Sequence, residues 1–505
     1  METWLLFLIP FSFFAATILL KFFFFPSANK LPPGPPSFPF IGSSVWFTES
    51  LIDINALIRS LHSKFGPIIT LYIGSRPAIF VADGFLAHQA LVQNGVVFAD
   101  RPPAVGMEAI NSSNQHTISS ASYGPTWRLL RRNLTSEIIH PSRFKSYSQS
   151  RKRILQILKI RLESESKSGG KVRVIDHFKY ATFSLLALIC VGDDLEEDQI
   201  EKIEAAQRQF VLNYVRFNVF GICPSITKLV FRKMWKQYLQ IRENQEKVLI
   251  PLIRARKDQQ EREIKDRSYV DSLIDLELPE EKRKLTEEEI VSLCSEIFNG
   301  GTETTSTALE WIMANLVKYP KIQEKLFMEI KSVVADGDQE LIKEDDLQKM
   351  PYLKAVILEG LRRHPPAHMV VPHAVKEDTM LDQYLVPKNA TVNFMVAEIG
   401  RDPRVWEDPM EFKPERFMES EEVFDVSGSK EVKMMPFGVG RRICPGYSLA
   451  ILHLEYIVGN LIWSYEWKAM EGEEIDLSEQ LQFSVAMKHP LQPCLSPRHS
   501  LKKII

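Results

Sequence analysis

The residues best suited to carry chemistry surround one cysteine near the C-terminus. Cys444 follows a loop that contains Gly438 and Gly440, and it precedes a run with helical spacing. A thiol at a helix N-terminus beside cationic side chains favours the thiolate, so Arg441 and Arg442 are expected to lower the pKa of Cys444. Glycines let the backbone turn sharply and approach whatever the sulfur binds. One thiolate with backbone N–H groups aimed at it is what a haem-thiolate site requires; the alternative is a buried structural cysteine.

A second group lies on a helix that the sequence predicts from Thr286, whose hydroxyl can begin a capping box, to about residue 317. Gly300-Gly301 lies within this helix, and each glycine costs about 1 kcal/mol relative to alanine. We therefore expect the helix to be opened there, with a ligand against its backbone. Glu303-Thr304 follows, and a carboxylate beside a hydroxyl can relay protons through water to a buried site. The alternative is an exposed glutamate next to a threonine that bonds the preceding turn.

Two further pairs have helical spacing. Glu359 and Arg362 are three residues apart, on one face of a helix that should end at His364-Pro365-Pro366. Such pairs usually decorate a solvated helix. Trp127 and Arg131 are four apart and reach one side of their helix. The alternative for that cluster is a basic surface face.

Composition bounds the class of protein. The chain has 505 residues, of which 45% are hydrophobic and 25% charged, as in an ordinary globular protein. A net charge of −2 argues against nucleic-acid binding driven by phosphate contacts. The five cysteines form no CxxC pair, which indicates a reducing compartment without a disulfide framework or a zinc cluster.

The N-terminus indicates a membrane anchor. No charged residue occurs between positions 3 and 20, and roughly 20 apolar residues cross a bilayer as a helix. A cleaved signal peptide is the alternative, but its basic n-region is missing. Lys21 and Lys30 place the body of the protein on the cytosolic side. We predict an anchor at 1–25, a stiff proline-rich hinge at 26–40, and one mainly helical domain at 41–505 with a minor sheet that includes a hairpin at 67–81.

Taken together, the segments 301–305, 361–366 and 436–446 resemble the cytochrome P-450 family, and they are most similar to the plant A-type microsomal branch. The resemblance covers the chain from the hinge to Pro490. It implies the P-450 fold, mainly α with a minor β-sheet region, behind an N-terminal transmembrane helix. It also implies haem b ligated by Cys444, in a monooxygenase that inserts one atom of dioxygen into a lipophilic small molecule. Electrons would come from NADPH through a reductase at the endoplasmic reticulum membrane, with the catalytic domain facing the cytosol.

The same resemblance assigns roles to individual residues. Glu303 and Thr304 would assist proton delivery, and Arg416 would join Glu359 and Arg362 in a buried, structural ionic triad on the proximal side of the haem. The residues expected to contact the haem are Trp127, Arg131, His373, Phe437, Arg442 and Gly446. His373 is a departure, because many members of the family carry arginine there. The outward-facing arginines of the Arg128–Arg132 cluster would dock an acidic reductase.

The resemblance also places the distal pocket, which should be apolar with a few polar points and suits a lipophilic substrate. Its expected lining is 111–118, 217–220, 298–299, 367–371 and 483–487, with Asn299, His368 and Ser484 as the polar points. Residues 217–220 could equally be core or a loop that dips into the membrane.

Two other functions compete with the monooxygenase. One is a haem-thiolate isomerase or dehydratase that rearranges a peroxide without reductase or dioxygen, which the Glu303-Thr304 pair disfavours. The other is a membrane-anchored haem protein that carries electrons or binds gas without transforming a substrate. A requirement for NADPH and reductase separates the first from the monooxygenase, and NADPH oxidation coupled to product formation excludes the second.

Overall fold

A computed structural model of the chain describes residues 31–35, 54–73, 76–169, 171–192, 195–221, 223–259, 267–334, 341–419 and 424–498. The predicted anchor at 1–25 lies outside the described residues, as does most of the predicted hinge.

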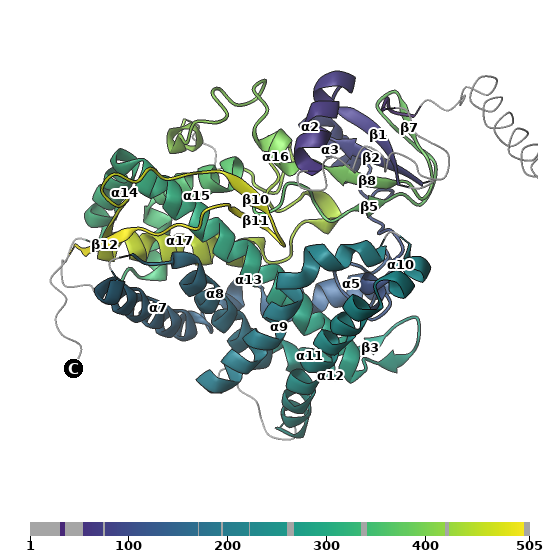
Figure 1. Ribbon diagram of the computed structural model, residues 1–505, viewed down its shortest axis with the longest axis horizontal. Helices are drawn as coiled ribbons and strands as arrows, with labels where there is room; N and C mark the ends of the chain where they lie inside the picture. Colours follow the sequence, from purple (N-terminus) through teal and green to yellow (C-terminus); the bar gives the residue numbers. More distant parts are fainter. Residues whose placement is uncertain are drawn as a thin grey trace, which may run out of the picture.

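Helices make up most of the described chain (Figure 1). The α-helices are α2 (Ile54–Phe65), α3 (Gly84–His88), α4 (Met107–Asn111), α5 (Pro125–Asn133), α6 (Pro141–Phe144), α7 (Ser148–Gly169), α8 (Val174–Val191), α9 (Glu197–Phe217), α10 (Pro224–Val230), α11 (Arg232–Gln259), α12 (Tyr269–Ile274), α13 (Glu287–Lys318), α14 (Pro320–Val333), α15 (Pro351–Arg363), α16 (Val396–Gly400) and α17 (Tyr447–Ser464). Short π- or 3₁₀-helical turns are η2 (Gln89–Gln93), η3 (Leu134–Ile138), η4 (Asn218–Gly221), η5 (Glu344–Lys349), η6 (Pro414–Phe417) and η7 (Gly440–Arg442).

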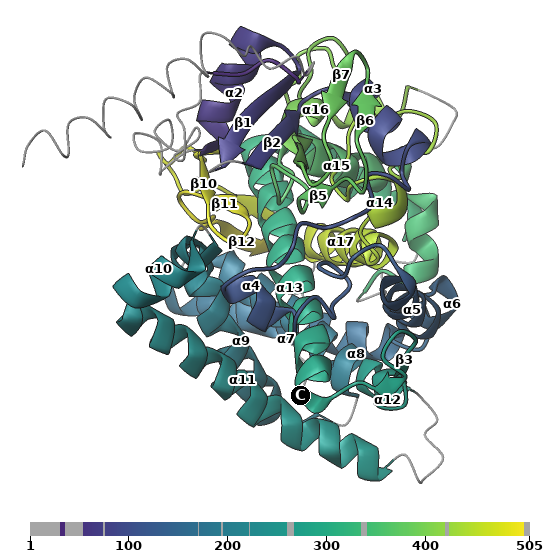
Figure 2. The same cartoon turned by 90° about the vertical axis from the view of Figure 1, so that its right-hand side faces the viewer.

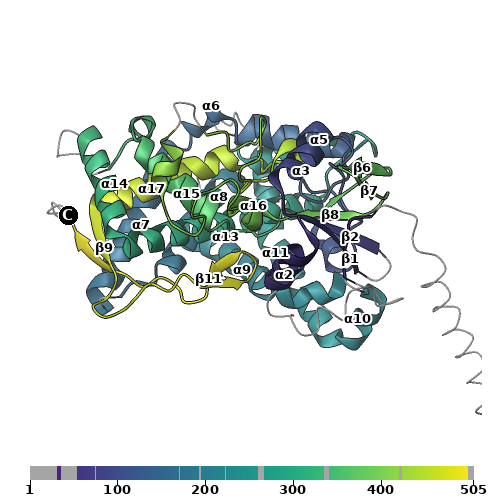
Figure 3. The same ribbon diagram turned by 90° about the horizontal axis from the view of Figure 1, so that it is seen from above.

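The strands are short and form small sheets. They are β1 (Ile68–Ile73), β2 (Arg76–Val81), β3 (Glu277–Leu278), β4 (Arg283–Lys284), β5 (His373–Ala374), β6 (Thr379–Leu381), β7 (Tyr384–Val386), β8 (Thr391–Phe394), β9 (Tyr465–Lys468), β10 (Glu479–Leu481), β11 (Val485–Met487) and β12 (Cys494–Pro497). The largest sheet has the order β1-β2-β8-β5, and its β1–β2 pair is the predicted hairpin. Figure 3 shows this sheet at one end of the molecule, with most of the long helices beyond it and strand β9 near the opposite end.

The long central helix α13 organises the core. The Thr286 hydroxyl accepts from the Glu289 N–H at 3.3 Å while the Glu289 carboxylate accepts from the Thr286 N–H at 2.8 Å, which confirms the predicted capping box. Figure 2 shows α13 crossing the middle of the molecule. Its residues join those of α8, α15 and α17 in the main hydrophobic cluster. The prediction of a mainly helical domain with a minor sheet is therefore correct.

Among the described helices, α8 alone is long and apolar enough to span a membrane by length and composition, and 83% of it is buried inside the protein.

Candidate active site

The loop before α17 presents Cys444. Gly438 and Gly440 have φ of 68° and 72°, the left-handed region that glycine adopts without strain. A Cβ on Gly440 would lie 1.9 Å from the carbonyl oxygen of Leu91, so the loop also needs a glycine there for close packing. The Cys444 N–H donates to the Phe437 carbonyl at 2.8 Å, and this bond closes the loop. These contacts fix the backbone of the loop around Cys444.

The environment of Cys444 differs from the expectation. Burial raises the pKa of its thiol, and the Gly446 N–H and the charge of Arg131 oppose that shift only in part. Arg441 instead donates to the Tyr123 hydroxyl at 2.8 Å. The predicted lowering of this pKa by the two neighbouring arginines is therefore wrong, because their side chains are engaged elsewhere. A metal bound to this sulfur would itself favour the thiolate.

Arg442 is held by backbone oxygens. Its guanidinium donates to the carbonyls of Ala99 at 2.7 Å, Ala121 at 2.6 Å and Ile118 at 3.2 Å. It also lies 4.5 Å above the ring of Trp127. Burial lowers the pKa of Arg442 to about 10. The arginine therefore ties the cysteine loop to the segment before α5.

Helix α5 brings Trp127 and Arg131 to the same site. The Trp127 indole Nε1 is buried and has no hydrogen-bond partner. Burial lowers the pKa of Arg131, and the nearby Cys444 opposes this. A buried indole donor without an acceptor is costly. Together with the cation beside it, this donor fits an anionic group such as a haem propionate, so the residues present suit the cofactor that the resemblance implies.

His373 is a neutral neighbour of two arginines. Its Nδ1 lies 2.7 Å from the Phe98 carbonyl, which makes Nδ1 the protonated nitrogen. Burial and then the charge of Arg101 hold the pKa of His373 well below its usual value. A neutral ring cannot replace the charge of the arginine that many members of the family have at this position.

Arg101 is a site residue that the sequence reasoning missed. Its guanidinium is buried and donates to the carbonyls of Ser119 at 2.7 Å and of both Val371 and Pro372 at 2.9 Å. Burial, and then the charge of Arg442, lower the pKa of Arg101 to about 9. Its position directly before Pro102-Pro103 was the signal that could have drawn attention to it.

Helix α13 runs unbroken through its glycine pair. The hydroxyl of Thr304 donates to the Gly300 carbonyl at 2.6 Å. The predicted opening of the helix is therefore wrong. Gly301 has a packing role instead, because its Cβ would lie 2.7 Å from the Leu186 side chain of α8. A Cβ on Gly300 would meet nothing within 4 Å, so this glycine borders open space.

Glu303 and Thr304 face different sides of α13. The Glu303 carboxylate pairs with Lys179 of α8 at 2.8 Å. It borders a hollow between α8, α9 and α13, which is also lined by Asn299 and Thr302. The Asn299 Oδ1 and the Thr302 Oγ1 atoms are buried without partners, so the hollow offers polar groups to water. Lys179 was missed, because nothing in the spacing of the sequence links it to α13.

The structure brings Glu359, Arg362 and Arg416 together. Arg362 donates to both carboxylate oxygens of Glu359, at 2.7 and 2.8 Å. Arg416 donates to the same carboxylate at 3.2 Å, and the Lys413 N–H does so at 2.8 Å. The side chains of Glu359 and Arg362 are 0% exposed. The pair is therefore buried rather than a decoration of a solvated helix.

Several residues expected to line the pocket instead contact other side chains of the protein. The Ser484 hydroxyl lies 2.7 Å from that of Thr307, and the His368 ring lies 3.1 Å from the Glu479 carboxylate. Within 217–220, Phe217 and Phe220 are core residues, because both are fully buried in an aromatic cluster, whereas Asn218 between them is exposed. Of the three expected polar points, Asn299 and His368 have buried polar atoms without a hydrogen-bond partner in the described chain, namely the Asn299 Oδ1 and the His368 Nδ1. Phe437 packs 6.2 Å from the Tyr447 ring, between the loop and α17.

A half-buried thiol in a glycine-containing loop, a cation near it and a buried indole donor without an acceptor match what a haem-thiolate class of protein needs. The family model "Cytochrome P450", written here cytochrome P-450, matches residues 32–495. Cytochrome P-450 89A9 of Arabidopsis thaliana is 50% identical over 95% of this chain and 96% of that protein. An isoflavone 2'-hydroxylase of Medicago truncatula is 30% identical over 94% of each chain.

A solved zebra fish cytochrome P-450 with progesterone has the same fold, with a TM-score of 0.72 at 23% identity, covering 88% of this chain and 99% of that one. The chain therefore belongs to the cytochrome P-450 family. It is a P-450 monooxygenase, and its relatives place it with the plant enzymes of the A-type branch.

Proposed function

We propose that this chain binds haem b through Cys444 and inserts one atom of dioxygen into a lipophilic small molecule, with electrons from NADPH passed by a reductase. The observation that carries the proposal is the buried Trp127 indole without an acceptor, next to Arg131 and the thiol. When bound, the haem supplies dioxygen activation, which a thiolate ligand promotes.

The residues named above would contact the propionates and the rim of the haem ring. Trp127 and Arg131 would donate to one propionate, while Arg442 would contribute its charge next to them. Arg101 would supply the positive charge that His373 lacks. Phe437 and Gly446 would shape the thiol side of the ring.

Protons would come through α13. Glu303 faces the hollow beside Lys179 and is placed to receive protons from solvent. The Thr304 hydroxyl donates to the carbonyl of Gly300, a residue that borders open space, and it would pass a proton onward when it rotates away from that carbonyl. Because the two side chains face different sides of the helix, water must connect them.

Location at the endoplasmic reticulum membrane and docking of a reductase belong to the proposal. Helix α10 supports the membrane location, because Ile226, Leu229 and Val230 are 60%, 68% and 64% exposed on it. Arg128 and Arg132 on α5 are exposed cations that suit an acidic reductase. Binding of the reductase should then weaken as salt rises.

The test is the spectrum of the reduced carbon-monoxide complex. Cys444→Ser should abolish the thiolate-type Soret band, while Cys494→Ser, which changes another half-buried cysteine, should retain it. A normal band in Cys444→Ser refutes the ligand assignment. A panel of lipophilic compounds should give product only with NADPH and reductase; turnover without them favours the isomerase or dehydratase instead.

A further inference from the structure

The segment after α4 has an unusual backbone. Ser113, Asn114 and Gln115 have φ of 47°, 56° and 68°, so consecutive non-glycine residues are left-handed. L-amino acids disfavour this conformation, and it persists only where surrounding contacts hold it. We call residues 112–119 the roof segment, because it joins two walls of the site. The Ile118 N–H donates to Glu296 of α13 at 2.9 Å, and the Ile118 carbonyl accepts from Arg442 of the cysteine loop at 3.2 Å.

One face of α13 holds the roof segment at three points. His116 Nδ1 lies 3.3 Å from the Glu289 carboxylate, and the Ser113 hydroxyl lies 2.7 Å from that of Ser292. The Glu296 carboxylate accepts from the N–H groups of Ile118 and Ser119, at 2.9 and 2.6 Å. Glu289, Ser292 and Glu296 are spaced at three and four residues, so they form one polar stripe. These contacts therefore fix the position of the roof segment relative to α13, the helix that carries Thr304.

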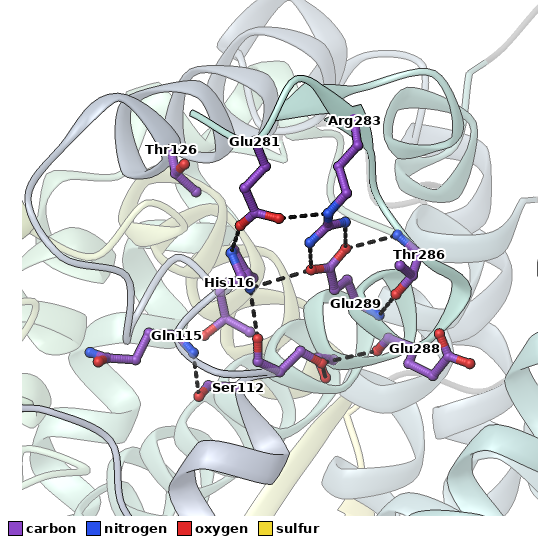
Figure 4. Close-up of polar contacts among 12 residues, drawn as sticks. Ser112, Gln115, His116, Thr126, Glu281, Arg283, Thr286, Glu288 and Glu289 are labelled. Carbon is purple, nitrogen blue, oxygen red and sulfur yellow. Dashed lines mark hydrogen bonds and ion pairs between the residues drawn. The ribbon is translucent and has the colours of Figure 1, made fainter. Parts of the chain in front are cut away.

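His116 connects this stripe to the β3–β4 hairpin. Its Nε2 lies 2.8 Å from Glu281 in the hairpin, and its Nδ1 lies 2.7 Å from the Ser113 carbonyl. Arg283 joins the two carboxylates, at 2.6 Å from Glu281 and 2.7 Å from Glu289. Figure 4 shows His116 between Glu281 and Glu289, with Arg283 bridging them.

The hairpin also reaches the cofactor side of the site. Glu280 accepts a hydrogen bond from the Thr126 hydroxyl on α5, next to Trp127. Adjacent hairpin residues, Glu280 and Glu281, therefore contact α5 and the roof segment. The hairpin acts as a brace between the two.

We propose that His116 is a positioning residue of the active site: by bridging Glu281 and Glu289 it holds the strained roof segment closed, and its release admits bulky ligands. Without His116, the segment loses its link to the hairpin and one of its contacts to α13. The left-handed residues then favour opening, because leaving that conformation relieves strain. The proposed function enters this inference at one point: it identifies the space beneath the roof segment as the active site.

Hydrogen exchange tests the roof segment without any need for haem or activity. In the full chain, His116→Ala should speed exchange of the amides at 115–119 by about tenfold, and leave α17 unchanged. Glu281→Gln should give a smaller increase of the same pattern, and it serves if His116→Ala folds poorly. Glu288→Gln is the matched control, since it removes an exposed charge from the same helix end. Unchanged exchange in His116→Ala, or an equal rise in Glu288→Gln, overturns the proposal.

A second variant tests the role of strain. Asn114 is exposed and left-handed, so Asn114→Gly relieves strain in the closed form without removing a packed side chain. Adding it to His116→Ala should bring the exchange back toward that of the parent. If the double variant exchanges as fast as His116→Ala, strain does not drive opening and that part of the proposal is refuted.

Optical binding of azoles then tests access. In stopped flow, 4-phenylimidazole should bind ferric His116→Ala at least about tenfold faster than the parent, while imidazole changes less, because the smaller ligand needs less opening. Equal acceleration of both ligands, or of neither, refutes control of access by His116. If His116→Ala speeds amide exchange as expected but the protein shows no haem spectrum, the proposed function is contradicted and the role of His116 in holding the roof segment is not.

Discussion

The buried ionic triad makes the most quantitative prediction, through Glu359→Gln. One carboxylate oxygen of Glu359 accepts from Arg362, Arg416 and the Lys413 N–H, and the other accepts from Arg362 at 2.7 Å. A glutamine can keep its carbonyl toward the three donors, but its NH₂ group then faces the Nε–H of Arg362, donor against donor. The substitution also leaves two cations without their shared anion.

The expected loss of stability is about 3–5 kcal/mol, the range for breaking a buried ion pair by removing one partner. Arg362 keeps its bonds to the carbonyls of Gly400 and Pro409, at 2.9 and 2.8 Å, so it cannot move to water without breaking those as well. Arg362→Lys should lose a similar amount, because an ammonium cannot reproduce the forked contact with the carboxylate.

Urea unfolding followed by far-ultraviolet circular dichroism measures the effect as a lower midpoint at unchanged slope. The matched control is Asp198→Asn, which breaks an ion pair between two exposed side chains on α9 and should leave the midpoint in place. If Glu359→Gln unfolds at the same urea concentration as Asp198→Asn, the triad does not stabilise the fold and the reasoning fails.

Three other substitutions follow from the site and the core. Thr304→Ala should keep the haem content but lower product formed per NADPH by at least about tenfold, with hydrogen peroxide as the other product, and unchanged coupling would mean that protons arrive elsewhere. Gly440→Ala should destabilise by more than about 4 kcal/mol and prevent haem uptake, because its Cβ would meet the Leu91 carbonyl at 1.9 Å; a soluble, haem-loaded variant contradicts this. Burial, and then the charge of Arg151, lower the pKa of His453 to about 3. Between this value and the unfolded pKa of about 6.5, the unfolded chain binds one more proton than the folded chain at this position, so the free energy of unfolding decreases as the pH is lowered through that range. Urea titrations at several pH values measure this effect. In His453→Leu the free energy of unfolding should depend less on pH, by about 1.4 kcal/mol per pH unit. Parallel plots of unfolding free energy against pH for variant and parent would refute the assignment.

The sequence predicts best where local rules decide the structure. The bounds of α13 follow from a capping box and an apolar period, and the β1–β2 hairpin follows from two apolar runs around a glycine. Spacing alone put Glu359 and Arg362 on one helical face, but it gave no reason to bury them. Their burial depends on Arg416, which lies in a different segment, and the family resemblance supplied that partner.

The errors arise where distant segments meet. Neighbours in sequence suggested that the arginines beside Cys444 lower its pKa, yet the side chain of Arg441 reaches Tyr123 and the burial of the loop dominates. Likewise, the glycine pair at 300–301 predicts a helix opened against a ligand, whereas the close neighbour of Gly301 is Leu186 of α8. Which face of a helix a neighbour covers is a property of the packing, and no local pattern encodes it.

The positive charge beside His373 comes from a distant segment of the chain. His373 occupies a strand position where many members of the family carry arginine, and its burial keeps it neutral. Arg101 approaches from the loop before α4 and donates to the carbonyls of Val371 and Pro372, directly before His373. The guanidinium of Arg101, which comes from another segment, therefore lies beside the uncharged His373. A charged imidazole would be repelled by Arg101 and by Arg442, so the neutral form of His373 is the one compatible with the cations around it.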